Sequence, residues 1–379
     1  MQCFKLLVSR VKRLLYLFNE HHMFARGKTL SHITYCLAGN SGDTVLSWCV
    51  RKIFEENKVA NKWNIKSVAN KVDDRFISSL NKTDGVVVGG GGLFLPDTNE
   101  NSISGWQWAI SRQQIKKITK PLVIYCVGYN YFPGQKINSV FKENLNELLE
   151  KSAFFGLRNT GSVNAVRELV DKRLKYKVVY QPCITTLIRK ICVIPPKKRN
   201  GVIAFNFAFD RAQLRFGDKK EHVIRQLIYA MQSIEKRGYK VLIVAHMKED
   251  LEVLKYTERK FEYVDASRFL PNELFKFYNG IDMVVGMRGH AQMIPFGVNC
   301  EILSICSHDK MKWFLEDIDC SDWGIDINEN LDDLGEIVLE KFIDVHERQS
   351  DITSRRLVYA QDKLYEITIA NMSKIANLF

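Results

Sequence analysis

Short apolar runs alternate with amphipathic segments along most of this chain. A typical apolar run, which contains Val86, Val87 and Val88, precedes segments whose apolar positions recur at helical spacing. A buried parallel strand is a continuous apolar run and its crossover helix is amphipathic, so this alternation predicts a parallel sheet covered by helices. The predicted strands of the first half are residues 31–38, 84–88, 121–127, 154–157 and 177–180, and the predicted helices are residues 44–56, 106–118, 137–151 and 162–169.

The alternation stops at residues 191–200, where Pro195 and Pro196 are followed by charged residues. Because proline disfavours regular structure, we interpret this segment as an interdomain linker. The pattern then restarts, and Gly238 marks the end of a long predicted helix. In the second half, strands are predicted at residues 201–207, 239–245, 281–285 and 300–306, and helices at residues 219–237, 248–260, 270–278, 331–348 and 352–377.

The two halves together predict an α/β protein with two doubly wound, Rossmann-like domains. Two such domains in succession are typical of the glycosyltransferase-B type of architecture, in which the active site lies in the interdomain cleft. We expect the first domain to span residues 31–190 and the second to span residues 201–350. Residues 351–379 are expected to form a C-terminal helix that is free to cross back to the first domain.

The N-terminal region, residues 1–30, is predicted to contain a basic amphipathic helix over residues 1–18. No small-residue cleavage site follows it, which argues against a signal peptide. The helix either lies on an anionic membrane surface or packs on the body of the protein. No run approaches the roughly 20 apolar residues of a membrane span. We expect a cytoplasmic protein, with peripheral contact at the inner face of the membrane as the alternative.

The charge balance favours an anionic partner, because 55 Lys and Arg outnumber 43 Asp and Glu for a formal net charge of +12. Such a partner is an acidic membrane surface, an anionic substrate or nucleic acid. The chain has no arginine-rich tail, zinc-finger spacing or aromatic RNA-binding motif, so we expect no nucleic-acid partner. Its 9 cysteines occur singly. We therefore expect reduced, buried thiols, and neither a disulfide framework nor a metal site.

The most informative segment for chemistry is residues 285–297, which follows a predicted strand. Arg288 and His290 stand where that strand ends and a short helix begins. Open α/β sheets bind ligands at the carboxyl ends of their strands, and the free N–H groups of a helix start attract anions. An arginine fork, the bare backbone of Gly289 and a titratable imidazole at this place predict a phosphate or carboxylate site.

Two glycine-containing segments of the first half are candidates for the opposite wall of the cleft. Asn40 and Asp43 follow the first predicted strand, and Asp43 is expected to cap the next helix. The alternative at this turn is an ordinary strand-to-helix connection. Four consecutive glycines follow residues 84–88, and a backbone without Cβ lets a ligand approach closely. We predict a cleft-lining loop here that contains Gly90, Gly91 and Gly92.

Two further segments of the first half carry polar or reactive side chains. Arg158 follows a predicted strand, where it either faces the cleft or is solvated above a capped helix. Cys183 is a candidate nucleophile, but no histidine lies near it in sequence. We therefore interpret Cys183 as a packed thiol.

Strand ends of the second half add further candidates. Asn206 and Arg211 follow its first strand, and Arg211 facing Arg288 would complete a two-arginine clamp on a dianion. His308 and Lys310 follow the strand after the arginine–histidine segment. Because neighbouring strands of a parallel sheet end at the same edge, these side chains are expected to face the same cleft.

In their order along the chain, these segments resemble the polysaccharide pyruvyl transferase family, over most of the chain. The most specific family signature is D-h-h-h-h-x-R-x-H-A, where h is apolar. The R-D-x-x-S element of the family has Asn159 in place of its aspartate, and the P-D element has Cys183 in place of its aspartate. The matching segments are residues 282–291 for the signature, residues 40–43 for an N-x-G-D turn, residues 88–93 for a strand ending in glycines, and Lys310 for a downstream lysine.

The resemblance implies a transferase that moves the pyruvyl group of phosphoenolpyruvate onto hydroxyls of a surface-polysaccharide sugar, on a glycan or lipid-linked oligosaccharide. The product is a pyruvate ketal, phosphate is released, and no cofactor is involved. The first domain would hold the acceptor and the second the donor. We expect His290 to supply or relay a proton, Arg288 and Arg211 to hold the donor, and Asp43 to orient or deprotonate the sugar hydroxyl.

Two other functions fit the same residues. A sugar-nucleotide-dependent glycosyltransferase of this architecture would hold a diphosphate at the same arginine and helix start. A catalytically inactive glycan-binding subunit of a polysaccharide assembly complex is consistent with the altered positions Asn159 and Cys183. Intact Asp43, Arg288 and His290 favour an enzyme.

Overall fold

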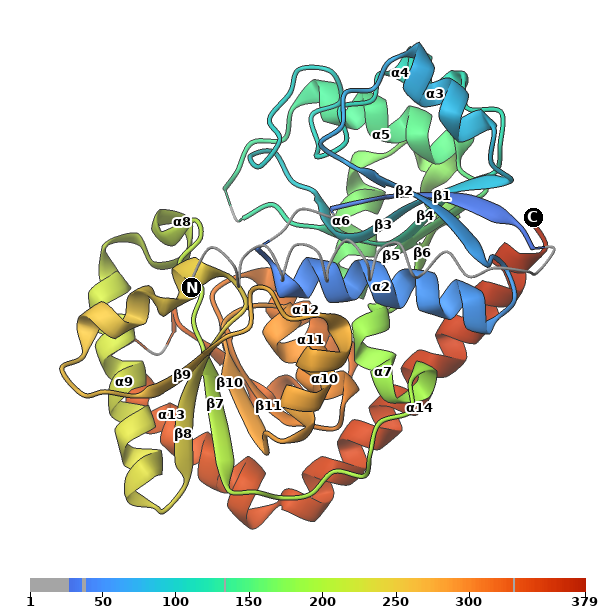
Figure 1. The fold of residues 1–379 in the computed structure, drawn as a ribbon. Coiled ribbons are helices and arrows are strands. Elements are labelled where there is room, and N and C mark those ends of the chain that lie inside the picture. Colours follow the sequence, from blue (N-terminus) through green and yellow to red (C-terminus); the bar gives the residue numbers. More distant parts are fainter. Residues whose placement is uncertain (1–26, 36–38, 133, 330) are drawn as a thin grey trace, which may run out of the picture.

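The computed structural model describes residues 27–35, 39–132, 134–329 and 331–379, and their strands form two six-stranded, fully parallel sheets (Figure 1). The first sheet has the order β2-β1-β3-β4-β5-β6. Parallel neighbours require crossover connections, and helices supply most of them. The strands are β1 (Thr29–Thr34), β2 (Lys62–Ser67), β3 (Gly85–Phe94), β4 (Leu122–Tyr129), β5 (Phe154–Leu157) and β6 (Val178–Tyr180).

The second sheet has the order β12-β11-β10-β7-β8-β9 and forms the C-terminal domain. The predicted α/β architecture of two doubly wound domains is therefore confirmed. Residues 192–201 connect the domains without regular secondary structure. The strands of this sheet are β7 (Val202–Asn206), β8 (Lys240–Ala245), β9 (Glu262–Asp265), β10 (Met283–Gly286), β11 (Glu301–Cys306) and β12 (Gly324–Asp326).

The first five α-helices that the structure describes in the first domain begin at side chains that accept hydrogen bonds from free backbone N–H groups. Asn40 caps α2 in this way, and Asp73, Asn138 and Asn159 cap α3, α5 and α6. The sequence prediction that Asp43 caps the first helix is wrong, because the amide of Asn40 occupies that position. The elements are α2 (Ser41–Glu56), α3 (Asp74–Asn81), α4 (Arg112–Lys116), α5 (Ser139–Lys151), α6 (Thr160–Leu169), the 3-10 helices η1 (Lys172–Lys177) and η2 (Ile184–Leu187), and α7 (Ile188–Ile191).

The helices of the second domain cover both faces of its sheet (Figure 1). Gly238 follows the long helix Lys220–Lys236, and its φ of +94° ends that helix as predicted. The elements are α8 (Ala212–Phe216), α9 (Lys220–Lys236), α10 (Pro271–Asn279), α11 (His290–Gly297), α12 (Asp309–Asp317), α13 (Leu334–Phe342) and α14 (Ser350–Ala376), with η3 (Gly217–Lys219), η4 (Lys248–Tyr256), η5 (Ser321–Trp323) and the π-helix η6 (Ile343–Arg348).

Each sheet has a point where the strand order reverses, between β1 and β3 in the first and between β7 and β10 in the second. At such a point the connections leave toward opposite faces and open a crevice at the carboxyl ends of the strands. The turn with Asn40 and Asp43 follows β1, and the segment with Arg288 and His290 follows β10. The sequence order therefore brings both candidate segments to crevices.

Helix α2 lies between the two sheets and contacts the second domain (Figure 1). The backbone N–H of Ser41, at its start, donates to the carbonyl of His246 at 3.2 Å. Further along the helix, the rings of Trp48 and Phe275 meet edge to face with centroids 5.8 Å apart. The N-terminus of α2, which carries Asp43, is thereby fixed to the second domain.

The final helix α14 runs from the second domain back to the first (Figure 1). The Asn371 side chain donates to the carbonyl of Tyr180, at the end of β6, at 2.9 Å. Gln181 donates to the hydroxyl of Thr368 at 3.3 Å. The last helix therefore joins the two domains.

Several sequence predictions of elements are wrong for identifiable reasons. Residues 106–118 were expected to form one helix, but only Arg112–Lys116 is helical. Asn101 and Ser104 donate side-chain hydrogen bonds to backbone carbonyls of residues 106–108 and hold a loop instead. The segment at 248–260 is a shorter 3-10 helix. The edge strands β2, β9 and β12 were not predicted, because they are short and polar.

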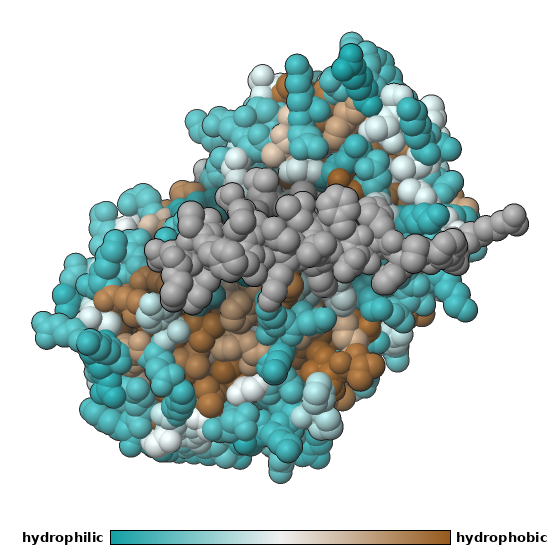
Figure 2. All heavy atoms as spheres, viewed as in Figure 1, coloured by the Kyte–Doolittle hydropathy of each residue, from teal (hydrophilic) through white to brown (hydrophobic). Residues whose placement is uncertain are grey.

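The predicted amphipathic helix of residues 1–18 lies outside the described residues. Where the structure describes the chain, it contains no helix that is both long and apolar enough to cross a membrane. Figure 2 shows one face of the molecule, where hydrophilic side chains cover most of the surface and hydrophobic ones gather over the C-terminal domain.

The four glycines at positions 89–92 lie inside β3, so the prediction of a loop after the strand is wrong. Gly89 has a φ of +148°, and a Cβ there would lie 1.8 Å from the carbonyl oxygen of Tyr125. A Cβ on Gly90 would meet Leu46 of α2 at 2.8 Å. Close packing of β3 against its neighbours, and not loop flexibility, explains these glycines.

We expect Gly89→Ala to lower the free energy of unfolding by at least about 3 kcal/mol, because it adds a clash with rigid backbone to a strained φ. Gly201→Ala is the matched control, since Gly201 has a φ of +66° and open space at the Cβ position. It is expected to cost about 1 kcal/mol. Urea unfolding of both variants measures the difference, and equal losses would contradict this account of β3.

Candidate active site

A cleft with a volume of about 1660 Å³ lies between the domains and is lined by residues of both. Its walls are the loops at the carboxyl ends of the central strands. The first domain contributes Tyr35, Asn40, Asp43, Gly91, Gly92, Asn130 and Arg158, among others. The second contributes Asp210, Arg211, Arg215, His246, Arg288, Gly289, His290 and Lys310, among others.

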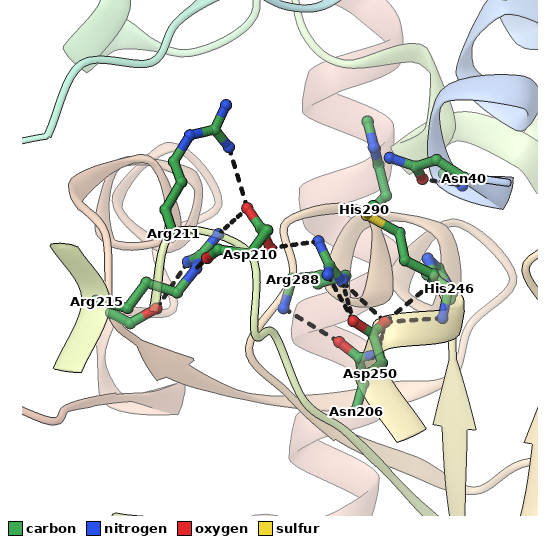
Figure 3. A network of polar contacts seen from close by, with 12 residues as sticks. Asn40, Asn206, Asp210, Arg211, Arg215, His246, Asp250, Arg288 and His290 are labelled. Atoms are coloured by element: carbon green, nitrogen blue, oxygen red, sulfur yellow. Dashed lines mark hydrogen bonds and ion pairs between the residues drawn. The ribbon is translucent and has the colours of Figure 1, made fainter. Parts of the chain in front are cut away.

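Arg288 is held by two carboxylates at the base of the cleft (Figure 3). Its Nε donates to Asp250 Oδ2 at 2.8 Å, its Nη2 to Asp250 Oδ1 at 2.5 Å, and its Nη1 lies 2.7 Å from Asp210 Oδ1. The Asp250 side chain is 0% exposed and that of Arg288 is 11% exposed. Despite burial, Asp250 and Asp210 raise the pKa of Arg288, so the guanidinium stays charged.

Asn206 orients the backbone of the same segment from below. Its Oδ1 accepts a hydrogen bond from the backbone N–H of Arg288 at 3.2 Å, and its amide donates to the carbonyl of Val244 at 2.9 Å (Figure 3). Asn206 is buried and does not line the cleft. The structure therefore places this predicted binding residue behind the wall, where it fixes the turn after β10.

Asp210 gathers three arginines at one side of the cleft (Figure 3). It pairs with Arg288, with Nη1 of Arg211 at 3.0 Å and with Nη2 of Arg215 at 3.1 Å. Burial alone would raise the pKa of Asp210, but Arg288 and Arg215 hold it well below its usual range. Asp210 is thus an anion that neutralises part of the cationic cluster.

Arg211 bridges the cleft to the first domain. Its Nε and Nη2 donate to the two oxygens of Asp97 at 2.6 and 2.7 Å, and Nη2 also donates to Thr98. The residue has a left-handed backbone, with a φ of 53°. The structure therefore brings Arg211 near Arg288 through Asp210, and engages it with a carboxylate of the opposite wall.

His290 and Asp43 face each other across the domain boundary, with 3.9 Å between Nδ1 and Oδ1. A Cβ on Gly42 would lie 2.9 Å from Nδ1, so glycine is needed for the imidazole to approach α2. Asn40 donates to Asp43 Oδ2 at 2.8 Å. Burial raises the pKa of Asp43, against the opposite effect of His290 and Arg158. This carboxyl is therefore suited to exchange a proton.

Arg158 and Lys310 are cations without a carboxylate partner among the described residues. Lys310 Nζ donates to Asn130 Oδ1 at 2.9 Å, and Nε of the buried Arg158 makes no hydrogen bond to any described residue. A Cβ on Gly128 would lie 2.2 Å from Nε of Arg158, so a glycine makes room for this arginine. Burial, together with Arg215 and Arg158, holds the pKa of Lys310 well below its usual range. An anion that binds beside Lys310 therefore favours its charged form.

The remaining predicted binding residues divide into two groups. Gly91, Gly92 and Gly289 line the cleft. Gly90 faces Leu46 instead. His308 lies behind Lys310, where its Nδ1 accepts the Lys310 backbone N–H at 3.2 Å and burial lowers its pKa to about 2. It is a neutral helix cap that orients the lysine.

Sequence reasoning missed Asn130, Arg215, His246 and Asp250. Each of them follows the carboxyl end of a strand in its domain, which is the signal that was available. Where the structure describes the chain, it has no group of three or more His, Cys, Asp or Glu side chains placed to hold a metal.

A family model for polysaccharide pyruvyl transferases matches residues 40–305. The chain belongs to the polysaccharide pyruvyl transferase family. Membership makes it a transferase that acts on polysaccharide. The matched span begins at the cap of α2, ends in β11, and includes Asp43, Arg158 and the arginine–histidine segment. No curated protein matches the sequence.

Three solved structures illustrate the shared fold. An α,α-trehalose-phosphate synthase (UDP-forming) from Burkholderia vietnamiensis has a TM-score of 0.53 and 8% identity, covering 94% of this chain and 99% of that chain. A glycosyltransferase from Rickettsia africae has a TM-score of 0.51 and 13% identity, with 93% and 97% covered. A UDP-GlcNAc 2-epimerase from Neisseria meningitidis, bound to UDP-GlcNAc, has a TM-score of 0.50 and 10% identity, with 90% and 100% covered.

The two positions that depart from the pyruvyl transferase motifs have different surroundings. Asn159 caps α6 by accepting the Ser162 backbone N–H at 2.7 Å, which an amide does as well as a carboxylate. Cys183 is 2% exposed and is therefore a packed thiol, as predicted. No histidine lies near Cys183 along the sequence, but the fold brings one close to it. In space, Cys183 lies within hydrogen-bonding reach of His290.

We expect Asp250→Ala to lower the free energy of unfolding by about 3–5 kcal/mol, because it leaves the Arg288 guanidinium buried without its main partner. Asp322→Ala is the control, since the bidentate pair of Asp322 and Arg356 is partly exposed, and about 1 kcal/mol or less is expected. Urea unfolding measures both. Similar losses of unfolding free energy in the two variants would show that Asp250 does not compensate a buried charge on Arg288.

His246 makes folding sensitive to acid, because burial, with Arg288 and His290, lowers its pKa from 6.5 to about 3. The unfolded chain therefore binds a proton that the folded chain does not, and its contribution to stability is lost as pH falls below 6.5, by about 1.4 kcal/mol per pH unit. We expect His246→Gln, which does not titrate, to flatten the acid side of the stability profile. Urea unfolding between about pH 7.5 and pH 5 tests this, and parallel profiles of variant and wild type would refute it.

Proposed function

We propose that this protein transfers the pyruvyl group of phosphoenolpyruvate onto two hydroxyls of a polysaccharide sugar, forming a cyclic pyruvate ketal and releasing phosphate. The observation that carries the proposal is the pair Arg158 and Lys310, which have no carboxylate partner among the described residues, beside the facing side chains of His290 and Asp43. This reaction has an anionic donor substrate and requires a proton transfer, so it needs both groups of side chains. Family membership supports the same conclusion.

The donor carries a phosphate and a carboxylate, and the cleft offers separate cations for them. Arg158 provides a planar fork suited to bidentate binding, and Lys310 provides a point charge. The Arg288 guanidinium has N–H groups on Nη1 and Nη2 beyond those that bond Asp250 and Asp210. An anion bound here also compensates the burial cost of the two unpartnered cations.

The chemistry requires one proton to reach C3 of the enol and two to leave the sugar hydroxyls. In the proposed sequence, His290 protonates C3, which becomes the methyl group, while a first hydroxyl oxygen attacks C2 and Asp43 accepts its proton. The second hydroxyl oxygen then displaces phosphate from C2, and its proton leaves with the phosphate. The raised pKa of Asp43 suits a carboxylate that must take up a proton.

The acceptor has room beyond the donor position. The cleft volume of about 1660 Å³ is larger than a typical small-molecule site, and Tyr263, Arg268 and Phe269 of the second domain are among its lining residues. Aromatic and arginine side chains suit a glycan with an anionic neighbouring group. We assign this part of the cleft to the acceptor, and so place the acceptor on the second domain, where the sequence resemblance implied the first.

A sugar-nucleotide-dependent glycosyltransferase is the second candidate, favoured by the likeness to the trehalose-phosphate synthase in fold. Thermal unfolding with ligands separates the two. Phosphoenolpyruvate, and not UDP or GDP, is expected to raise the Tm, because a ligand stabilises only the protein that binds it. The opposite pattern would favour the glycosyltransferase, and no stabilisation by any of these ligands would favour a glycan-binding subunit.

We expect Arg158→Ala and Lys310→Ala each to lower kcat/KM for phosphoenolpyruvate by roughly 10- to 100-fold, because each removes a charged hydrogen bond to the donor. Lys312→Ala is the matched control, since Lys312 is on the same helix as Lys310, pairs with Asp326 and does not line the cleft. Phosphate release with host glycan intermediates as acceptors is the assay. Wild-type protein that releases no phosphate with any acceptor would overturn the reaction.

A further inference from the structure

Cys183 stands at the start of η2, on a segment of the first domain that packs against α11. The contact is tight: a Cβ on Gly297 of α11 would lie 2.0 Å from the carbonyl oxygen of Thr185. Cys183 is 2% exposed and does not line the cleft. Its position is therefore fixed by packing, and substrate does not reach it.

The thiol of Cys183 has three polar neighbours. Its Sγ lies 3.2 Å from the hydroxyl of Thr185, and both the Cys126 thiol and the His290 imidazole lie within hydrogen-bonding reach. On the His290 ring, Nε2 is buried and has no hydrogen-bond partner among the described residues, while Nδ1 is the atom near Asp43. The imidazole thus lies between a thiol of one segment and a carboxylate of another.

We propose that Cys183 is a positioning residue for His290, whose sulfur accepts a hydrogen bond from Nε2–H and so turns Nδ1 toward Asp43 and the cleft. This inference rests on the proposed function, in which Nδ1 delivers the proton to the enol carbon. The partner of one imidazole nitrogen sets the tautomer and the ring orientation available at the other. A sulfur acceptor behind the ring therefore determines which nitrogen faces the substrate.

The electrostatics of the cluster favour sulfur as an acceptor. Burial would raise the pKa of Cys183, but hydrogen bonds from Cys126 and His290 hold it well below its usual range. Burial raises the pKa of Cys126, which keeps that thiol protonated and able to donate. Other titratable or charged groups surround the cluster. Those that interact with its thiols are Cys49, Tyr125, Tyr180 and Arg158, and those near its His290 side are Asp43, His246, Arg288 and Lys310.

The family motif places an aspartate at this position, and a carboxylate is also an acceptor. The chain therefore has one hydrogen-bond acceptor in place of another of different chemistry. Cys183→Asp should restore the function that Cys183→Ala removes. A residue that only filled space would not show this rescue, because alanine leaves a small cavity and aspartate adds a charge.

The experiment compares Cys183→Ala, Cys183→Asp and Cys300→Ala for phosphoenolpyruvate turnover. Cys300 is equally buried at the opposite end of the second sheet from the cleft, so it controls for the loss of a packed sulfur. We expect Cys183→Ala to lower kcat by roughly 10- to 100-fold with little change in the KM for phosphoenolpyruvate. Cys183→Asp is expected to recover most of the loss, and Cys300→Ala to behave as wild type.

A second measurement does not need activity. Nitrogen NMR of histidine-labelled protein reports the tautomer of His290, which is assigned with His290→Gln. Wild type and Cys183→Asp are expected to share Nε2 protonation, and Cys183→Ala to lose it. Wild-type kcat in Cys183→Ala, no recovery in Cys183→Asp, or an unchanged tautomer in Cys183→Ala would each overturn the inference. If wild type is inactive with phosphoenolpyruvate, the proposed function fails and the tautomer alone decides the role of Cys183.

Discussion

The buried pair of Arg288 and Asp250 is the interaction on which the rest of the site depends. Taking both charges out of water is costly, so such a pair adds little net stability, and its contribution is geometric. Asp250 also accepts the backbone N–H groups of His246 and Met247 at 3.0 and 3.1 Å. One carboxylate therefore ties the loop after β8 to the turn after β10, and sets where His290 begins its helix.

The same loop transmits this constraint to the other domain. The His246 carbonyl accepts the Ser41 backbone N–H at the start of α2, two residues before Asp43. Arg211 and Asp97 hold the cleft at its other side. A continuous chain of hydrogen bonds between the domains therefore holds Asp43 opposite His290. Two titratable side chains from separate domains need such a chain to remain within reach of each other.

The sequence predicted site residues whose position depends on the neighbouring residues of the chain. It did not predict residues whose role depends on a partner far away in sequence. Arg288 and His290 were located because an apolar run ends just before them. Asp250 was missed because its partner is on another strand, and Cys183 was separated from His290 because only the packing of η2 on α11 joins them. The glycines of β3 were interpreted as a loop, since composition shows conformational freedom and does not show the neighbours, such as Tyr125, that leave no room for a Cβ.

The cations of the cleft fall into two groups, according to whether they pair with a carboxylate. Arg211, Arg215 and Arg288 all bond carboxylates, so their charges are already compensated and they mainly hold loops in place. Arg158 and Lys310 have no such partner among the described residues, and a buried cation without a counter-ion is destabilising. A fold that keeps two of them side by side beside an acid–base pair is stabilised when an anion arrives. The strongest sequence signal, Arg288, therefore shapes the site, and the weaker candidates supply most of the uncompensated positive charge of the cleft.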